Sequence, residues 1–270
     1  MANDLVVVTW NGEGEPFPLI RRDAEPAFEL ASFCYTGAPA QPSASVRLFA
    51  HKTQCKGEAF SALIADLEAS RETFGYVGFI DDDVELSVSG INCMLERGHA
   101  HGHATFAAGL TADSHLSHQR FVQRPGSTMR PAAWVEVMAP FVRWELLHAA
   151  GPLIAGNTSS YGVDQFVMPM LEKVLSLPGS VIHDDVPMRH VRPITSDGRV
   201  FANGLTAEQE RVAQRQRCLE YVRAHHPELV GTRWWFNWGA PWDGPAPFWA
   251  LRLAQPYWAV RRAMGSKNNG

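Results

Sequence analysis

The first half of the chain alternates short apolar runs with polar loops. Continuous apolar runs of about five residues are typical of strands that are buried on both faces of a parallel sheet. Between the third and fourth runs, apolar side chains recur at helical spacing and predict a helix over Gly57–Arg71. The predicted strands are Leu5–Thr9, Phe28–Tyr35, Val46–Ala50 and Tyr76–Ile80.

The middle of the chain continues this pattern less regularly. Apolar positions 91, 94 and 95 predict a short helix that ends at Gly98, a residue type common at helix ends. The alternating histidines of His99–His103 have no cysteine near them, and only Glu96 as a nearby carboxylate, to complete a metal site. We interpret them as a polar turn before the next strand or as a loop that lines a binding site.

The second half predicts two strands, over Thr105–Leu110 and Trp134–Val142, and an apolar helical face over Val163–Leu175. Val181 and Ile182 lead into a polar segment. A charged helix follows near Ala207–Ala224, and Thr206 with Gln209 predicts a capping box at its start.

Strands that alternate with a helix and with polar loops predict an α/β sandwich with a mainly parallel sheet. In such sheets ligands bind beyond the carboxyl ends of the strands. We divide the chain into an α/β domain, residues 1–203, and a C-terminal helix with a tryptophan-rich basic extension, residues 204–270.

The fourth predicted strand ends in three adjacent aspartates, Asp81, Asp82 and Asp83. A buried strand cannot cover three unpaired charges, so these side chains must meet water, cations or a metal. In an extended segment alternate side chains point the same way. Asp81 and Asp83 would then converge on one ion while Asp82 turns aside. The competing interpretation is a solvated acidic turn that caps the next helix.

Composition narrows the classes of protein to consider. The chain has 270 residues, of which 46% are hydrophobic and 19% charged, so a large core is expected. A net charge of −4 argues against nucleic acid as the main partner. Four scattered cysteines give no zinc or disulfide framework. Without a secretory leader or an apolar run of 18 residues, we expect a cytoplasmic protein.

The C-terminal 40 residues differ from the rest of the chain. They hold six of the nine tryptophans, interleaved with basic residues. A tryptophan-rich basic segment is typical of a membrane interface, which gives a possible peripheral contact through residues 234–262. The alternative is that Pro241, Pro245 and Pro247 shape a tail that packs back on the domain.

Together these features resemble the GT-A glycosyltransferases, which use nucleotide-diphospho-sugars. The resemblance covers residues 5–200 and rests on Val6–Thr9 as first strand, on Phe79–Asp83 as a "DxD" motif, and on later acidic and histidine residues. Trp134–Pro140, Tyr161–Asp164 and Asp185–His190 are similar to the "VE.MAP", "G.D" and Asp/His elements of a little-characterised GT-A-like branch.

This resemblance implies a GT-A-type, Rossmann-like α/β/α sandwich and transfer of a sugar to a glycan or glycolipid acceptor. It implies a UDP-sugar as first choice of donor and Mn²⁺ or Mg²⁺ as cofactor, because a metal stabilises the leaving diphosphate. Asp81, Asp83 and His190 are the expected metal ligands. His183 with Asp184, or Arg192 as a phosphate clamp, are alternatives to His190.

The resemblance also implies an inverting reaction in which a carboxylate deprotonates the acceptor hydroxyl. Asp164, at the head of a predicted helix, is the expected base, and helix capping is the alternative role. Glu136 lies in a predicted apolar strand and is a second candidate base or an acceptor contact. Otherwise it is a buried partner of Arg130 or Arg143.

Residues at the other strand ends are expected to contact the donor, the aromatic ones through the base and the lysines through the phosphates. The expected donor-binding residues are Thr9, Trp10, Asn11, Tyr35, Lys52, Lys56, Asp81 and Asp82.

Two other functions compete with transfer. A sugar nucleotidyltransferase shares the sheet and the metal, but it usually has a basic glycine-rich loop after the first strand, whereas residues 10–15 here are acidic. A non-catalytic carbohydrate- or membrane-surface-binding protein would use exposed aromatics and keep the aspartates as structural residues.

Overall fold

The computed structural model describes residues 3–39, 46–116, 118–193 and 198–238. Contacts divide the chain into two compact units, Met1–His226 and Pro227–Gly270. The expected division at residue 203 stays a prediction. Within the described ranges, no helix combines the length and apolar character needed to cross a membrane.

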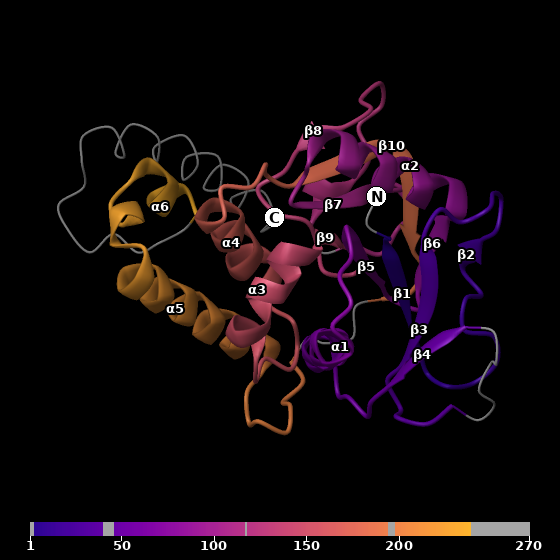
Figure 1. The fold of residues 1–270 in the computed structure, drawn as a ribbon, viewed down its shortest axis with the longest axis horizontal. Coiled ribbons are helices and arrows are strands. Elements are labelled where there is room, and N and C mark those ends of the chain that lie inside the picture. The colour runs from indigo at the N-terminus through magenta and orange to yellow at the C-terminus, as the bar shows by residue number, and fades with distance from the viewer. Residues whose placement is uncertain (1–2, 40–45, 117, 194–197, 239–270) are drawn as a thin grey trace, which may run out of the picture. The chain divides into compact units, whose positions relative to one another are not determined.

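The first unit is built on one mixed sheet (Figure 1). Its order is β2-β6-β10-β7-β9-β5-β1-β3-β4, and β8 pairs with β10. The parallel part of the sheet contains the buried apolar runs of the sequence. The strands are β1 (Leu5–Trp10), β2 (Ile20–Arg21), β3 (Glu29–Cys34), β4 (Arg47–Ala50), β5 (Tyr76–Ile80), β6 (Val84–Ser87), β7 (Thr105–Leu110), β8 (Arg130–Pro131), β9 (Phe141–Arg143) and β10 (Val181–His190).

Helices cover both faces of this sheet, because alternate side chains of a strand point to opposite faces. On β5, Phe79 packs against Phe60 of α1, while Tyr76 packs against His99 of α2. The expected α/β class is therefore confirmed. The helices of the first unit are α1 (Lys56–Ser70), α2 (Val88–His101), α3 (Trp144–Ile154), α4 (Met168–Val174) and α5 (Ala207–His225), with a π-helical turn η2 (Val163–Val167) before α4 and a short 3₁₀ turn η1 (Gln119–Phe121).

One antiparallel strand determines what reaches the carboxyl edge of the sheet. β9 pairs antiparallel with both β5 and β7, so it enters the sheet at the edge where those two strands end. The segment before β9, residues 136–140, therefore lies at this edge: Met138 accepts a hydrogen bond from Asp81 N at 2.9 Å. The expected strand over Trp134–Val142 was too long, since only Phe141–Arg143 is paired.

The end of α2 also differs from expectation. The helix continues past Gly98 and ends at Gly102, which has a positive φ of 67°. Gly98 is instead needed for packing, because a Cβ there would lie 2.5 Å from the Phe106 ring. His99 and His101 thus belong to the last turn of a helix, and the interpretation of His99–His103 as a turn was wrong for these two residues.

The second unit contains a 3₁₀ turn η3 (Pro227–Leu229) and the short helix α6 (Arg233–Asn237). The Thr232 hydroxyl caps α6 by accepting a hydrogen bond from Trp235 N. The rings of Trp234 and Trp238 stack at 5.1 Å. Most of the tryptophan-rich segment expected at a membrane lies outside the described residues.

Candidate functional site

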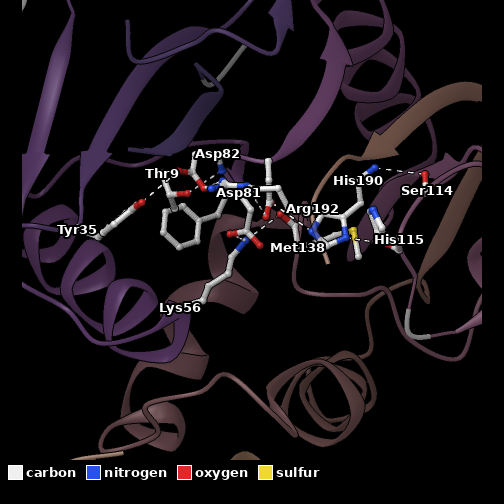
Figure 2. Close-up of polar contacts among 12 residues, drawn as sticks. Thr9, Tyr35, Lys56, Asp81, Asp82, Ser114, His115, Met138, His190 and Arg192 are labelled. Atoms are coloured by element: carbon white, nitrogen blue, oxygen red, sulfur yellow. Dashed lines mark hydrogen bonds and ion pairs between the residues drawn. The ribbon is translucent and has the colours of Figure 1, made fainter. Parts of the chain in front are cut away.

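A polar cavity of about 310 Å³ lies at the carboxyl edge of the parallel strands. β1, β3 and β5 end in it, β10 ends beside it, and the N-terminus of α1 forms its wall (Figure 2). Ligand sites of open parallel sheets occur at this edge, and the volume is at the lower end of small-molecule pockets. The cavity is lined by Thr9, Tyr35, Thr53, Gln54, Cys55, Lys56, Ala59, Asp81, Asp82, Asp83, Arg192 and Pro193.

The three aspartates do not continue the strand. Val84 N donates to Asp81 O at 3.1 Å, which closes a turn over residues 81–84. The expected alternation of an extended segment is therefore wrong. The turn directs the three carboxylates toward different partners: Asp81 toward α1, Asp82 toward β3, and Asp83 toward the end of β10.

Asp81 is paired with a buried lysine. Lys56 Nζ lies 2.7 Å from Asp81 Oδ1 and also donates to the carbonyls of Phe79 at 3.0 Å and Met138 at 2.9 Å. Three donors thus meet three acceptors, and the ammonium is saturated. Burial raises the pKa of Asp81 to about 6, and Lys56 limits this rise. Lys56, expected to approach the phosphates, is here bonded within the protein.

Lys56→Met should lower the free energy of unfolding by about 3 kcal/mol, because it leaves Asp81 without its partner in a largely buried position. The loss should shrink at pH 5, where Asp81 accepts a proton and the uncompensated charge disappears. Urea unfolding at pH 5 and pH 7.5 measures both effects. The control is Lys52→Met at an exposed position, for which we expect a change within about 0.5 kcal/mol. Equal losses in the two variants would contradict the pairing.

Asp82 is held by neutral and cationic donors together. Tyr35 donates its hydroxyl to Asp82 Oδ2 at 3.1 Å, and Arg192 Nη2 lies 2.5 Å from Oδ1. Thr9 accepts the backbone N–H of Asp82 at 2.9 Å. Burial, followed by the charge of Asp82, raises the pKa of Tyr35 to about 12, so its hydroxyl stays a donor at neutral pH.

Asp83 faces His190. Its Oδ1 is buried, lies 3.3 Å from His190 Nε2, and makes no hydrogen bond of good geometry to a described residue. His190 Nδ1 lies 2.7 Å from the carbonyl oxygen of His115, which can only accept, so Nδ1 carries a proton. Burial opposes the charged form of both side chains, but their contact prevails: it raises the pKa of His190 and lowers that of Asp83.

This pair fits a divalent cation. A ligating histidine commonly donates its second ring nitrogen to a carbonyl, as His190 does to His115. One carboxylate oxygen and one imidazole nitrogen suit Mn²⁺. Asp81 is bonded to Lys56 and does not join them. In the part of the chain that the structure describes, no group of three or more His, Cys, Asp or Glu side chains is arranged to hold a metal ion. Water and ligand oxygens would have to complete such a site.

Asp164 does not line the cavity, but the segment before β9 links it to residues that do. Its carboxylate accepts the Gln165 N–H at 2.8 Å and a further hydrogen bond from the backbone of Val137. Burial, with the charge of Glu136 next, raises the pKa of Asp164 to about 8. Val137 therefore contacts Asp164, while Met138 contacts Asp81 and Lys56. Asp164 is inside η2 rather than at its cap, which is Gly162.

The other residues singled out from the sequence lie elsewhere. Trp10 is buried with its indole N–H on Glu13 O, and Asn11 Oδ1 accepts the Glu13 N–H. Lys52 is exposed and does not line the cavity. His183 and Asp184, the alternatives to His190, contact other protein groups instead of the cavity. His183 packs against Phe106 and Arg97, and Asp184 pairs with Arg130.

Sequence reasoning missed the backbone groups that orient the site. Carbonyls of Met138 and His115 position Lys56 and His190, and the Ser114 hydroxyl accepts the His190 N–H at 3.2 Å. A carbonyl is present at every position, so its role leaves no signal in the sequence. The π-helical turn at Asp164, a feature frequent at functional sites, was not expected either.

Several solved structures resemble this chain at low sequence identity. S. aureus TarS 1-349 in complex with UDP-GlcNAc is 12% identical, with 88% of this chain and 79% of that chain covered and a TM-score of 0.47. A second S. aureus TarS structure is 10% identical, covering 86% and 44%, with a TM-score of 0.47. For 4-diphosphocytidyl-2C-methyl-D-erythritol synthase the identity is 14%, the coverage 73% and 95%, and the TM-score 0.40. No protein-family model and no curated protein sequence matches the chain.

Proposed function

We propose that this chain is a metal-dependent, inverting glycosyltransferase of the GT-A type that uses a nucleotide-diphospho-sugar, UDP-sugars being the first class to test. The observation that carries the proposal is the position of a buried carboxyl, Asp164, with a pKa near 8, beside the segment that contacts the acidic cavity. A base works best when its pKa is near the operating pH.

In the proposed complex the diphosphate of the donor lies in the cavity beside Asp81–Asp83. Asp83 and His190 would hold the divalent cation, which supplies Lewis-acid stabilisation of the diphosphate charge. Asp82 and Tyr35 line the same cavity on the β3 side and would bind the nucleoside part. Lys56 keeps Asp81 and the Met138 carbonyl in place rather than binding phosphate.

The acceptor hydroxyl would lie between the donor and Asp164. Its oxygen forms the new bond to the anomeric carbon while the bond from that carbon to the phosphate oxygen breaks. Asp164 accepts the hydroxyl proton, and the electron pair of the broken bond leaves with the nucleoside diphosphate. Attack from the face opposite the diphosphate inverts the anomeric carbon. Glu136, whose charge raises the pKa of Asp164, would bind the acceptor.

A panel of nucleoside diphosphates tests this proposal by calorimetry, with Mn²⁺ and with a chelator. We expect one diphosphate to bind in preference to its monophosphate, and more tightly with Mn²⁺. The matching sugar nucleotides should then hydrolyse slowly and release the diphosphate. Release of pyrophosphate from a nucleoside triphosphate would favour a nucleotidyltransferase. Glycan binding without any nucleotide affinity would favour a binding protein.

The proposed acceptor is a glycan or a lipid-linked glycan, and the proposed location is the cytoplasm with peripheral contact to a membrane through residues 234–262. The tryptophans and arginines of that segment support this part of the proposal. Co-sedimentation of the full chain with anionic vesicles tests it. A chain that stays in the supernatant at low salt would contradict the membrane contact.

A further inference from the structure

Two basic side chains, Lys56 and Arg192, contact the acidic turn of residues 81–84 in different ways. Lys56 has a side chain that is 9% exposed, and its three donors are used by three protein acceptors. The side chain of Arg192 is 53% exposed and follows the end of β10 by two residues. A saturated, buried ammonium cannot leave its partners cheaply, whereas a half-exposed guanidinium can exchange one set of oxygens for another.

Arg192 contacts two of the three carboxylates. Its Nη2 lies 2.5 Å from Asp82 Oδ1, and its Nε lies 3.3 Å from Asp83 Oδ2. Both aspartates hold the pKa of Arg192 above its usual value against the effect of burial. The guanidinium thus bridges Asp82, on the β3 side of the cavity, and Asp83, which faces His190.

The carboxylate of Asp83 is therefore shared. Its Oδ1 faces His190 and its Oδ2 faces Arg192. A divalent cation at Asp83 and His190 would lie close to the guanidinium, and like charges at such separations repel strongly. Arg192 in this position compensates the charge that would otherwise attract the metal. Metal binding and the Arg192–Asp83 pair consequently oppose each other.

We propose that Arg192 is an exchangeable counter-ion, which pairs with Asp82 and Asp83 in the free protein and moves to the diphosphate of the donor when that binds. This inference rests on the proposed function for the identity of the ligand. A guanidinium binds phosphate oxygens in a bidentate manner, so the donor offers Arg192 a new partner of the same kind. Its departure leaves Asp83 with His190 for the cation. Donor and metal then bind with positive coupling, and the coupling is reciprocal.

Arg192→Gln tests the exchange because it should move two affinities in opposite directions. Without the guanidinium, Mn²⁺ alone should bind roughly 5- to 10-fold more tightly, measured by electron paramagnetic resonance of free Mn²⁺. Uridine diphosphate in the presence of a chelator should bind roughly 10-fold more weakly by calorimetry. The enhancement of nucleotide affinity by Mn²⁺ should shrink, because the part of the coupling that runs through Arg192 is lost. Arg192→Lys, which keeps the charge but not the planar fork, should fall between the wild type and Arg192→Gln in both measurements.

Arg189→Gln is the matched control. Arg189 lies near the end of β10, just before Arg192 in the sequence. Its side chain is 45% exposed, and it pairs with Glu85 and Asp113 instead of the acidic turn. The control removes the same charge, so both affinities should stay within about twofold of the wild type.

The outcomes separate the two proposals. If Arg192→Gln lowers the affinity for both Mn²⁺ and uridine diphosphate, or changes neither affinity, Arg192 is a structural residue and the exchange is overturned. If the wild type binds no nucleoside diphosphate, the proposed function and the exchange both fall. If the wild type binds uridine diphosphate and Arg192→Gln matches it in both measurements, only the exchange falls.

Discussion

Asp83→Asn is expected to lower the rate of sugar transfer by roughly 10²–10³-fold. This is the range for losing electrostatic stabilisation of the leaving group, which Asp83 would provide by holding the metal. Asp83 faces both His190 and Arg192, so the change removes the only carboxylate of the acidic turn that contacts His190 among the described residues. The variant should also lose the enhancement of nucleotide affinity by Mn²⁺. Calorimetry with and without the metal measures this loss independently of turnover.

Asp185→Asn is the matched control for this variant. Asp185 also pairs with an arginine, Arg97, but it does not line the cavity. Its transfer rate and its response to Mn²⁺ should match those of the wild type. A Mn²⁺ response that persists in Asp83→Asn would show that the metal, if used, is held elsewhere.

Asp164→Asn is expected to lower transfer by roughly 10²–10⁴-fold while nucleotide affinity stays unchanged. The amide cannot accept the proton of the acceptor hydroxyl, but the cavity proposed for the diphosphate is lined by other residues. In the wild type, the transfer rate should rise with pH until the carboxyl is ionised, near pH 8. The residual transfer rate of Asp164→Asn should not increase over the same pH range. A variant with normal transfer would remove Asp164 as the base.

The pH dependence of stability gives a second measurement of the raised pKa of Asp164. Folding raises its pKa from 3.8 to about 8, so the protein favours the protonated carboxyl. Its contribution to stability is full below pH 4 and is lost as the pH rises toward 8. Asparagine does not titrate. The melting temperature of Asp164→Asn, relative to the wild type, should therefore increase from pH 4 to pH 8. A difference that is constant with pH would contradict the raised pKa.

Much of the sheet could be predicted because its central strands are buried on both faces. β1, β5 and α1 were expected within one or two residues, since uninterrupted apolar runs and helical spacing leave few alternatives. Predictions failed where one residue type has two uses. Gly98 suggested a helix end but makes room for Phe106, and the apolar run before β9 suggested a strand but is an irregular segment at the edge of the sheet.

The acidic turn was predictable as a place where charge must be compensated, but its partners were not. Asp81 takes Lys56 from the start of α1, and Asp83 takes His190 from the end of β10. Only the resemblance to a family indicated His190. The charge of Lys56 suggested a phosphate contact because the sequence does not show that two backbone carbonyls and a carboxylate saturate it.

The separation in sequence of the groups around the cavity has a consequence for folding. Lys56 and Met138 are 82 residues apart, and Asp82 and Arg192 are 110 apart. Closing such long loops costs chain entropy before any contact is gained. We therefore expect the cavity to form late, after the strands from both halves have paired.

In refolding, nucleotide binding should lag behind the far-ultraviolet circular dichroism signal; simultaneous recovery would contradict this order. Until then the three aspartates repel one another without their counter-ions, and added salt should speed this last step by screening them.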